Sequence, residues 1–368
     1  MFAHYTNYLI KLQKANLLRS LEVPKQVRLD FSSNDYLGLA NSPSLLEAGY
    51  ETARLYGSGS TGSRLLSGNS NLFEDFEAQI ATDSRTESAL LFNSGFDANI
   101  GIFSSLFDKN DLMIFDKLNH ASMYRGAALC GAKLLRYNHL DYIMLEHILK
   151  NNANKYKTIV LASETLFGMD GDLADLKTLA HLSTTYNTML YLDEAHAIGI
   201  QGQDGYGLAT GFELDKNRTI LMGTFSKALG STGGYVACNT LIKNILINRC
   251  PSFIYSTALA PFCIGASACA WEIVKTKTKE RMGLIETSNG LRNALNALGY
   301  NTLGNNTPII PVQFNSCDEM TRKKENLYKN GILVSGLRRP TVPSPRLRIA
   351  LNIKHIESDI TELLKALS

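Results

Sequence analysis

The stretch "TILMGTFSKALGSTGG", residues 219–234, carries the strongest indication of the fold. An apolar run opens it, polar residues follow, and a glycine-rich turn closes it. A run of this length and composition predicts a buried β-strand that ends shortly before Lys227. A lysine at the end of a strand is most often a solvated surface residue, so Lys227 alone does not indicate a function.

Similar apolar runs recur upstream: "ALLFNSG" from residue 89, "DLMIFDKLNH" from 111, "TIVLASETLF" from 158 and "MLYLDEAHAIG" from 189. Helical stretches such as "DLKTLAHLSTTYN" lie between them. This alternation predicts an α/β fold with a mostly parallel central sheet and crossover helices. In such sheets, ligands bind outside the carboxyl ends of the strands. The expected strand ends carry Asn93, His120, Glu164, Asp193, His196 and Lys227.

The sequence predicts three parts. Residues 1–38 form an N-terminal helical arm, because residues 4–20 alternate apolar and polar positions at helical spacing. Residues 39–275 form the large α/β domain. Residues 276–368 have a different sequence pattern, which predicts a smaller α+β domain that closes over the large one.

Composition narrows the class of protein. The 368 residues are 45% hydrophobic and 19% charged, with a net charge of +3, as in ordinary soluble globular proteins. No dense run of Lys or Arg predicts nucleic-acid binding, and no apolar run approaches the roughly 18 residues needed to span a bilayer. The six cysteines form no C-x-x-C pair and predict buried free thiols. We therefore expect a cytoplasmic protein that binds neither nucleic acid nor membrane.

The loop "YGSGSTGSRLLSG", residues 56–68, spells G-x-G-x-x-G at Gly57, Gly59 and Gly62. A dinucleotide-binding loop of this spelling follows a strand. The preceding "SPSLLEAGYETARLY" reads instead as a helix that begins after a Ser-Pro cap. A dehydrogenase built on this loop is therefore the least favoured alternative, and we expect the glycines to let the loop lie close to a ligand or another chain.

Asp193 and Lys227 lie 34 residues apart on successive predicted strands. Asp193 and His196 could serve a metal, but a metal needs further ligands at suitable spacing, so no metal site is expected. An acid and a lysine at neighbouring strand ends can instead hold a pyridine cofactor. The lysine forms a Schiff base with an aldehyde, and the carboxylate keeps a ring nitrogen protonated, so that the ring withdraws electrons.

Motifs along almost the whole chain resemble those of the α-oxoamine synthases, which depend on pyridoxal phosphate and have fold type I. They are "FSSNDYLGLA", "GSRLLSG", "FNSGFDAN", "LNHASM", "MDGDLADL", "DEAHAIG", "TFSKALGSTGG", "FIYSTALAP" and "RRPTVPSPRLRIAL". Their number and order make the resemblance specific. It implies pyridoxal 5'-phosphate as cofactor and a homodimer with shared active sites.

The resemblance also implies a role for individual residues. The catalytic residues would be Lys227, which binds the cofactor and moves the α-proton, Asp193 at the ring nitrogen, His196 at the phenolic oxygen and His120 on the ring face. The phosphate would be bound by Gly95, Phe96 and Thr224, and by Ser256 and Thr257 of the neighbouring subunit. The substrates would be bound by Arg19, Asn34, Ser63 and Arg348. Backbone amides at a helix start suit phosphate, and an arginine fork suits a carboxylate.

The activity implied is the decarboxylative condensation of L-alanine with a pimeloyl thioester, carried by coenzyme A or an acyl-carrier protein, in biotin biosynthesis. Alternatives in the same family condense glycine with acetyl-CoA, glycine with succinyl-CoA, or serine with a long acyl-CoA. A non-catalytic subunit that binds the cofactor is a further alternative. The presence of Lys227, Asp193 and His120 argues against it.

Three departures from the family pattern are visible. Gly168 stands where relatives have serine, Phe73 stands where they commonly have histidine, and "VPSPRLR" before and around Arg348 is about two residues shorter. We expect a serine introduced at 168 to add a hydrogen bond at the cofactor's phenolic oxygen. The shortened loop is expected to affect the geometry around Arg348.

Overall fold

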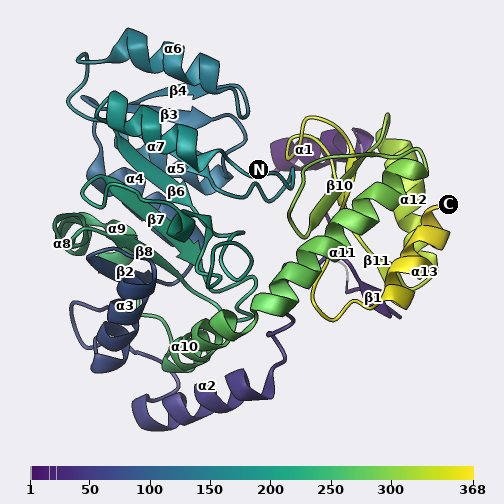
Figure 1. Ribbon diagram of the computed structural model, residues 1–368, viewed down its shortest axis with the longest axis horizontal. Coiled ribbons are helices and arrows are strands. Elements are labelled where there is room, and N and C mark those ends of the chain that lie inside the picture. The colour runs from purple at the N-terminus through teal and green to yellow at the C-terminus, as the bar shows by residue number, and fades with distance from the viewer. Residues whose placement is uncertain (1, 16, 22) are drawn as a thin grey trace.

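The computed structural model describes residues 2–15, 17–21 and 23–368, and it shows a large and a small part side by side (Figure 1). The sheet of the large part has the strand order β2 (Ser88–Phe92), β8 (Gly234–Cys238), β7 (Thr219–Thr224), β6 (Met189–Asp193), β5 (Ile159–Glu164), β3 (Leu112–Asp116) and β4 (Lys133–Tyr137). Neighbouring strands are parallel except at β8, which is antiparallel to both β2 and β7.

The apolar strand runs are explained by burial on both faces of this sheet. On β3, Met113 and Phe115 pack in one core cluster with Phe103, whereas Leu112 and Ile114 pack in the cluster on the opposite face. Strands of parallel sheets read as continuous apolar runs because helices cover both faces. The helices and the 3-10 turn of the large part are α2 (Pro43–Tyr56), α3 (Asn71–Asp83), α4 (Gly95–Leu106), α5 (Ala121–Cys130), α6 (Tyr142–Asn152), α7 (Leu176–Thr185), η1 (Leu208–Gly211), α8 (Thr240–Arg249), α9 (Pro251–Ile254) and α10 (Pro261–Thr276).

The small part is built around a second, antiparallel sheet. Its strand order is β12 (Ser335–Leu337), β13 (Arg346–Ala350), β10 (Ile309–Gln313) and β9 (Asn301–Thr302). Its helices are α11 (Thr278–Ala297), which runs between the two parts in Figure 1, α12 (Cys317–Lys329) and α13 (Glu357–Leu367). Near the N-terminus, α1 (Ala3–Lys14) precedes β1 (Leu29–Asp30), which pairs in parallel with β11 (Ile332–Leu333).

The predicted fold class is confirmed: the sheet is mostly parallel, and a smaller α+β part follows it. The helix predicted over residues 4–20 is too long, because α1 ends at Lys14. The division at residues 38 and 275 stays a prediction, and the β1–β11 pairing places the end of the predicted arm beside the small part. The expectation of buried cysteines is correct for Cys238 and Cys250 but wrong for the exposed Cys317.

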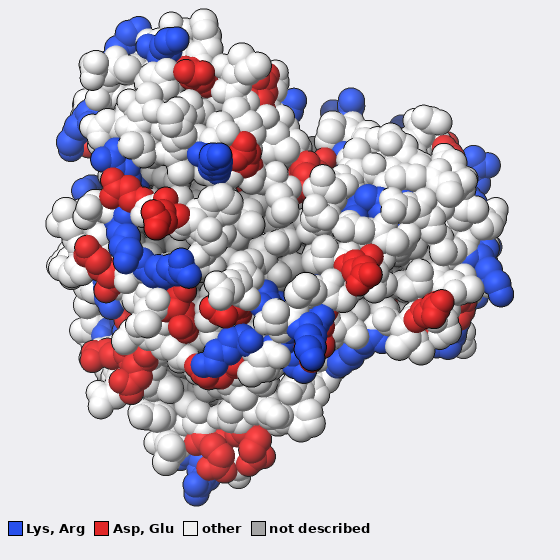
Figure 2. Space-filling view, viewed as in Figure 1, with Lys and Arg blue, Asp and Glu red and all other residues white. Residues whose placement is uncertain are grey.

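Acidic and basic side chains are interspersed on the face shown in Figure 2. Within the described ranges, none of the helices combines the length and apolar character needed to cross a membrane.

Candidate active site

Asp193 ends β6 and is buried, with an exposed fraction of 3%. Its Oδ2 atom accepts a hydrogen bond of 2.9 Å from Nδ2 of Asn99, and its Oδ1 atom accepts one of 3.0 Å from the amide of Ala195. Asn99 lies on α4 and in turn accepts a hydrogen bond from the hydroxyl of Tyr191. The carboxylate of Asp193 therefore has a fixed orientation at the carboxyl end of the sheet. Asn99 was not predicted from the sequence, although it is the last residue of the "FNSGFDAN" motif.

Lys227 follows β7, the strand next to β6. Burial lowers the pKa of its amine, while the negative charges of Asp193 and Glu164 act in the opposite direction. Burial is also the main cause that raises the pKa of Glu164 well above its usual value, and the neighbouring Asp193 adds to it. A lysine with a lowered pKa is more often neutral, which suits a nucleophile or a base.

The start of α4 offers an anion site. Its first intrahelical bond runs from the amide of Ala98 to the carbonyl of Ser94, so the amides of Gly95 and Phe96 precede it. A Cβ atom added at Gly95 would lie 3.4 Å from Cβ of Thr224, which brings the end of β7 against this helix start. Free amides and the helix dipole both favour a phosphate there.

Two hydroxyl groups extend this anion site. Oγ1 of Thr224 donates a hydrogen bond of 2.8 Å to the carbonyl of Gly233 and lies 2.9 Å from Oγ of Ser226. Thr224 was predicted from the sequence, but Ser226 was not. Its position two residues further along the same turn is the signal that could have revealed it.

His120 caps the N-terminus of α5. Its Nδ1 atom lies 2.6 Å from Oγ of Ser122, which accepts a hydrogen bond of 2.9 Å from the same Nδ2 atom of Asn99 that binds Asp193. One hydrogen-bonded chain thus joins His120 to Asp193. Burial is the main cause that lowers the pKa of His120, which favours a neutral ring at pH 7.

The small part contributes Arg348, on β13, to this site. Its Nε atom donates a hydrogen bond of 2.6 Å to the carbonyl of Gly168, and its Nη2 atom donates one of 2.8 Å to Oδ1 of Asn34. Nη2 also lies 3.3 Å from the hydroxyl of Tyr36, which is 2.8 Å from Nδ1 of His196. Tyr36 was missed by the sequence analysis, although it lies two residues after Asn34.

The shortened loop leaves Arg348 in regular strand register. Arg348 pairs with Pro311 of β10 and Ser335 of β12. The expected disturbance around Arg348 is therefore absent from the strand itself, because the sheet sets the position of its backbone. Phe73 packs in the core, with the guanidinium of Arg64 4.1 Å from its ring centre.

A steric contact explains why a glycine stands at position 168 in this chain. A Cβ atom at Gly168 would lie 2.1 Å from Nε2 of His196, closer than real Cβ contacts come. Burial is the main cause that lowers the pKa of His196 well below its usual value, so the ring is neutral at pH 7. A serine at 168 would therefore have to displace the ring of His196, and its expected hydrogen bond to the cofactor's phenolic oxygen stays a prediction.

We predict that Gly168→Ala lowers the free energy of unfolding by about 1–3 kcal/mol, as overpacking of a buried site does. Chemical denaturation measures this effect. Gly211→Ala is the matched control, because a Cβ atom there meets nothing within 4 Å. In a His196→Ala background the cost at 168 should largely vanish, and an equal cost in both backgrounds would contradict the contact.

The remaining predicted residues lie at the margin of this site. Oγ of Ser256 and the carbonyl of Thr257 accept hydrogen bonds from Asn93 of the same chain, at 2.7 and 2.8 Å. The loop that contains Ser63 docks on the same segment, since the carbonyl of Gly62 accepts a bond of 2.9 Å from the amide of Ala258.

Arg19 is exposed and lies further out. Its Nη2 atom donates a hydrogen bond of 3.3 Å to Oγ1 of Thr341, in the small part. The roles predicted for Arg19, Ser63, Ser256 and Thr257 stay predictions.

The fold and the site together define an enzyme of fold type I that uses pyridoxal phosphate. The residues fit this cofactor: an amine on Lys227, a buried carboxylate on Asp193, and a helix start at Gly95 where a side chain would contact Thr224. The dinucleotide reading of the glycine loop is wrong, because α2 rather than a strand precedes Gly57.

Comparisons with known proteins agree with this class. The family model for aminotransferase class I and II matches residues 27–367. A relative from Trichlorobacter lovleyi named 8-amino-7-oxononanoate synthase is 40% identical over 342 residues, which cover 92% of this chain and 87% of the relative. The chain belongs to the aminotransferase class I and II family, on the α-oxoamine synthase branch that contains the 8-amino-7-oxononanoate synthases.

Solved structures are similar over the same span. A high-resolution structure of SPT with a PLP internal aldimine has a TM-score of 0.91 at 25% identity, and the match covers 100% of this chain and 96% of that one. The crystal structure of 8-amino-7-oxononanoate synthase from Francisella tularensis has a TM-score of 0.80 at 29% identity, with 92% and 96% covered. The protein is therefore a pyridoxal-phosphate-dependent acyltransferase of the kind found in biotin biosynthesis.

Proposed function

We propose that the enzyme condenses L-alanine with a pimeloyl thioester and releases carbon dioxide, a free thiol and 8-amino-7-oxononanoate. The observation that carries the proposal is the position of Arg348. Its guanidinium, bonded to Asn34 and to Gly168, belongs to the same cluster as His196 and exerts a charge effect on Lys227. A substrate carboxylate bound there would place the amino-acid α-carbon near the amine. The 40% identity to a relative named 8-amino-7-oxononanoate synthase supports these substrates.

Each residue has a defined task in this proposal. Pyridoxal phosphate supplies the electron sink that makes the α-carbon of the amino acid acidic. Lys227 would hold the cofactor through its amine; once the amino group of the substrate has displaced it, the freed amine would take and return the proton at the α-carbon, which its lowered pKa favours. Asp193 holds a proton at the ring nitrogen, and Gly95, Phe96, Thr224 and Ser226 bind the phosphate. Arg348 and Asn34 orient the substrate carboxylate.

A serine-dependent synthase is the second candidate. The structure of SPT, which is serine palmitoyltransferase, has a higher TM-score than the Francisella tularensis structure, 0.91 against 0.80. The test adds L-alanine, glycine and L-serine separately to the cofactor-loaded enzyme and follows its visible spectrum. Pimeloyl-CoA or the pimeloyl thioester of an acyl-carrier protein is then added in parallel samples, and thiol release is measured. We expect rapid thiol release with L-alanine alone. Preference for L-serine would favour the second candidate, and no release with any amino acid would favour a non-catalytic subunit.

We also propose a homodimer in which Ser256 and Thr257 reach the partner's phosphate. Large apolar side chains near these residues support it: Leu66 and Tyr255 are each 84% exposed, and Phe96, at the phosphate site, is 48% exposed. Exposed apolar groups around a candidate site are typical of a surface that another chain covers.

We predict that two inactive variants, Lys227→Ala and Thr257→Trp, complement each other when they are refolded as a mixture. Half of the dimers would be mixed and each would contain one intact site, so activity should return to about a quarter of the wild-type value. Each variant refolded alone is the control. If each chain supplies its own Thr257, the mixture stays inactive, and that result would reject the shared site.

A further inference from the structure

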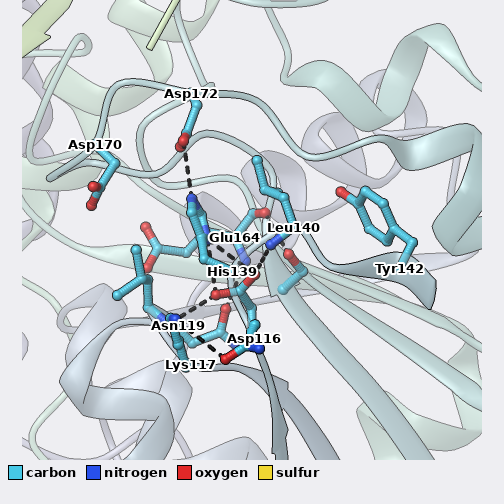
Figure 3. A network of polar contacts seen from close by, with 12 residues as sticks. Asp116, Lys117, Asn119, His139, Leu140, Tyr142, Glu164, Asp170 and Asp172 are labelled. Carbon is cyan, nitrogen blue, oxygen red and sulfur yellow. Dashed lines mark hydrogen bonds and ion pairs between the residues drawn. The ribbon is translucent and has the colours of Figure 1, made fainter. Parts of the chain in front are cut away.

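His139, which follows β4, lies between two carboxylates that come from different parts of the chain (Figure 3). Its Nδ1 atom is 3.0 Å from Oδ1 and 3.1 Å from Oδ2 of Asp116, at the end of β3. Its Nε2 atom is 3.0 Å from Oδ2 of Asp172. The imidazole side chain is 16% exposed, and the side chain of Asp116 is fully buried.

The first carboxylate organises the turn that leads to His120. The amide of Leu118 donates a hydrogen bond of 2.8 Å to Oδ1 of Asp116, and the amide of Leu140 donates one of 2.9 Å to Oδ2. The carbonyl of Asp116 accepts a bond of 3.1 Å from the amide of Asn119. Asp116 therefore fixes both the turn before His120 and the segment that carries His139.

The second carboxylate belongs to a hairpin over residues 165–174, which we call the bridging hairpin. Leu166 pairs with Leu173, and the amide of Phe167 donates a bond of 3.0 Å to the carbonyl of Asp172. Oδ1 of Asp172 is buried and has no hydrogen-bond partner among the described residues. The hydrogen bond to His139 is thus the main polar contact of the Asp172 side chain.

The other side of the bridging hairpin holds the small part. The carbonyl of Gly168 accepts the bond from Arg348, and Asp170 forms an ion pair of 2.7 Å with Arg346. The carbonyl of Gly171 accepts a hydrogen bond of 2.7 Å from Oγ1 of Thr307. The hairpin therefore stands between the sheet of the large part and β13 of the small part.

Both ring nitrogens of His139 face carboxylate oxygens, so both must donate a proton for the contacts to be favourable. Burial is the largest single effect and lowers the pKa of His139, but the hydrogen bonds to Asp116 and Asp172 and their charges together outweigh it and raise the pKa to about 10. The ring is consequently an imidazolium at neutral pH. Its positive charge lies between two carboxylates that would otherwise repel each other.

We propose that His139 is a positioning residue that ties the bridging hairpin to the turn before His120, and so sets where Arg348 meets the substrate carboxylate. The role of Arg348 rests on the proposed function. His139 itself contacts neither Lys227 nor Arg348 in the described contacts, so it acts through Asp172 and the hairpin. A loosened hairpin would misplace the carbonyl of Gly168 and with it the guanidinium.

The test compares the cofactor-loaded wild type with His139→Gln and Asp172→Asn, using His147→Gln on the exposed face of α6 as the matched control. Hydrogen exchange of the amides of Phe167, Gly171 and Ala174 measures the hairpin without any substrate. A titration with the amino acid that the wild type accepts, followed in the visible spectrum, measures carboxylate binding.

We expect faster hairpin exchange in both variants, and an apparent dissociation constant or KM for the amino acid raised roughly tenfold with kcat changed much less. The control should match the wild type. Unchanged exchange in Asp172→Asn would overturn the proposal even if His139→Gln failed to fold. Faster exchange with unchanged amino-acid binding would also overturn it. Failure of the proposed function is distinct, because it would appear in the wild type as no thiol release from either pimeloyl-CoA or the pimeloyl thioester of an acyl-carrier protein.

Discussion

Lys227→Ala is expected to abolish the covalent link to the cofactor and to lower the condensation rate by at least about 10²–10⁴-fold, the range lost with one proton-transfer group. Loss of the covalent link should add to this effect, because the cofactor would then be bound by non-covalent contacts alone, such as those to Asp193 and the phosphate site. Dialysis should remove the cofactor from the variant, as its absorbance will show. The chain offers Lys216, an exposed lysine, for the control Lys216→Ala.

Borohydride reduction followed by mass spectrometry locates the link directly. In the wild type the cofactor should be found on Lys227. A cofactor reduced onto a different lysine of Lys227→Ala, together with retained activity, would contradict the assignment.

Asp193→Asn should leave the cofactor bound but slow removal of the α-proton of L-alanine by roughly 10²–10³-fold, as loss of one preorganised electrostatic group does. The neutral amide cannot keep the ring nitrogen protonated, although its oxygen can still accept a hydrogen bond from Asn99 or Ala195. Exchange of the α-proton with solvent deuterium, followed by NMR, measures this step without the acyl substrate.

The adjacent Glu194 provides a stringent control. It is equally buried, and burial raises its pKa to about 7, but it accepts hydrogen bonds from Thr165 and from the amides of Leu208 and Ala209. Glu194→Gln should affect stability and leave α-proton exchange close to the wild-type rate. Equal slowing in both variants would mean that burial of a carboxylate, and not contact with the ring nitrogen, explains the loss.

Local sequence pattern was sufficient to predict much of the structure of this protein. The apolar runs that became β3, β5, β6 and β7 are continuous because both faces of the sheet are covered, and this is visible in the sequence. The helix before Gly57 was equally visible and excluded the dinucleotide reading. Asp193 and Lys227 could be paired because parallel strands end at the same edge of a sheet.

Local sequence pattern did not predict where the N-terminal helix ends or which distant segments pair. The helix predicted to residue 20 ends at Lys14, and nothing in its spacing indicated that β1 would pair with β11, about 300 residues away. Such a pairing depends on where the small part folds back, which no short window of sequence contains.

The sequence by itself therefore determined the α/β class and the strand ends, and it predicted Asp193 and Lys227 as a cofactor-binding pair, because these follow from periodicity and local chemistry. The tertiary structure alone decided how Asn99 joins His120 to Asp193, why His196 requires a glycine at 168, and how His139 meets Asp116 and Asp172. The physical reason is the same in each case. These contacts join residues from separate strands and loops, and their distances are set by sheet order and register, which the chain fixes only when it is folded.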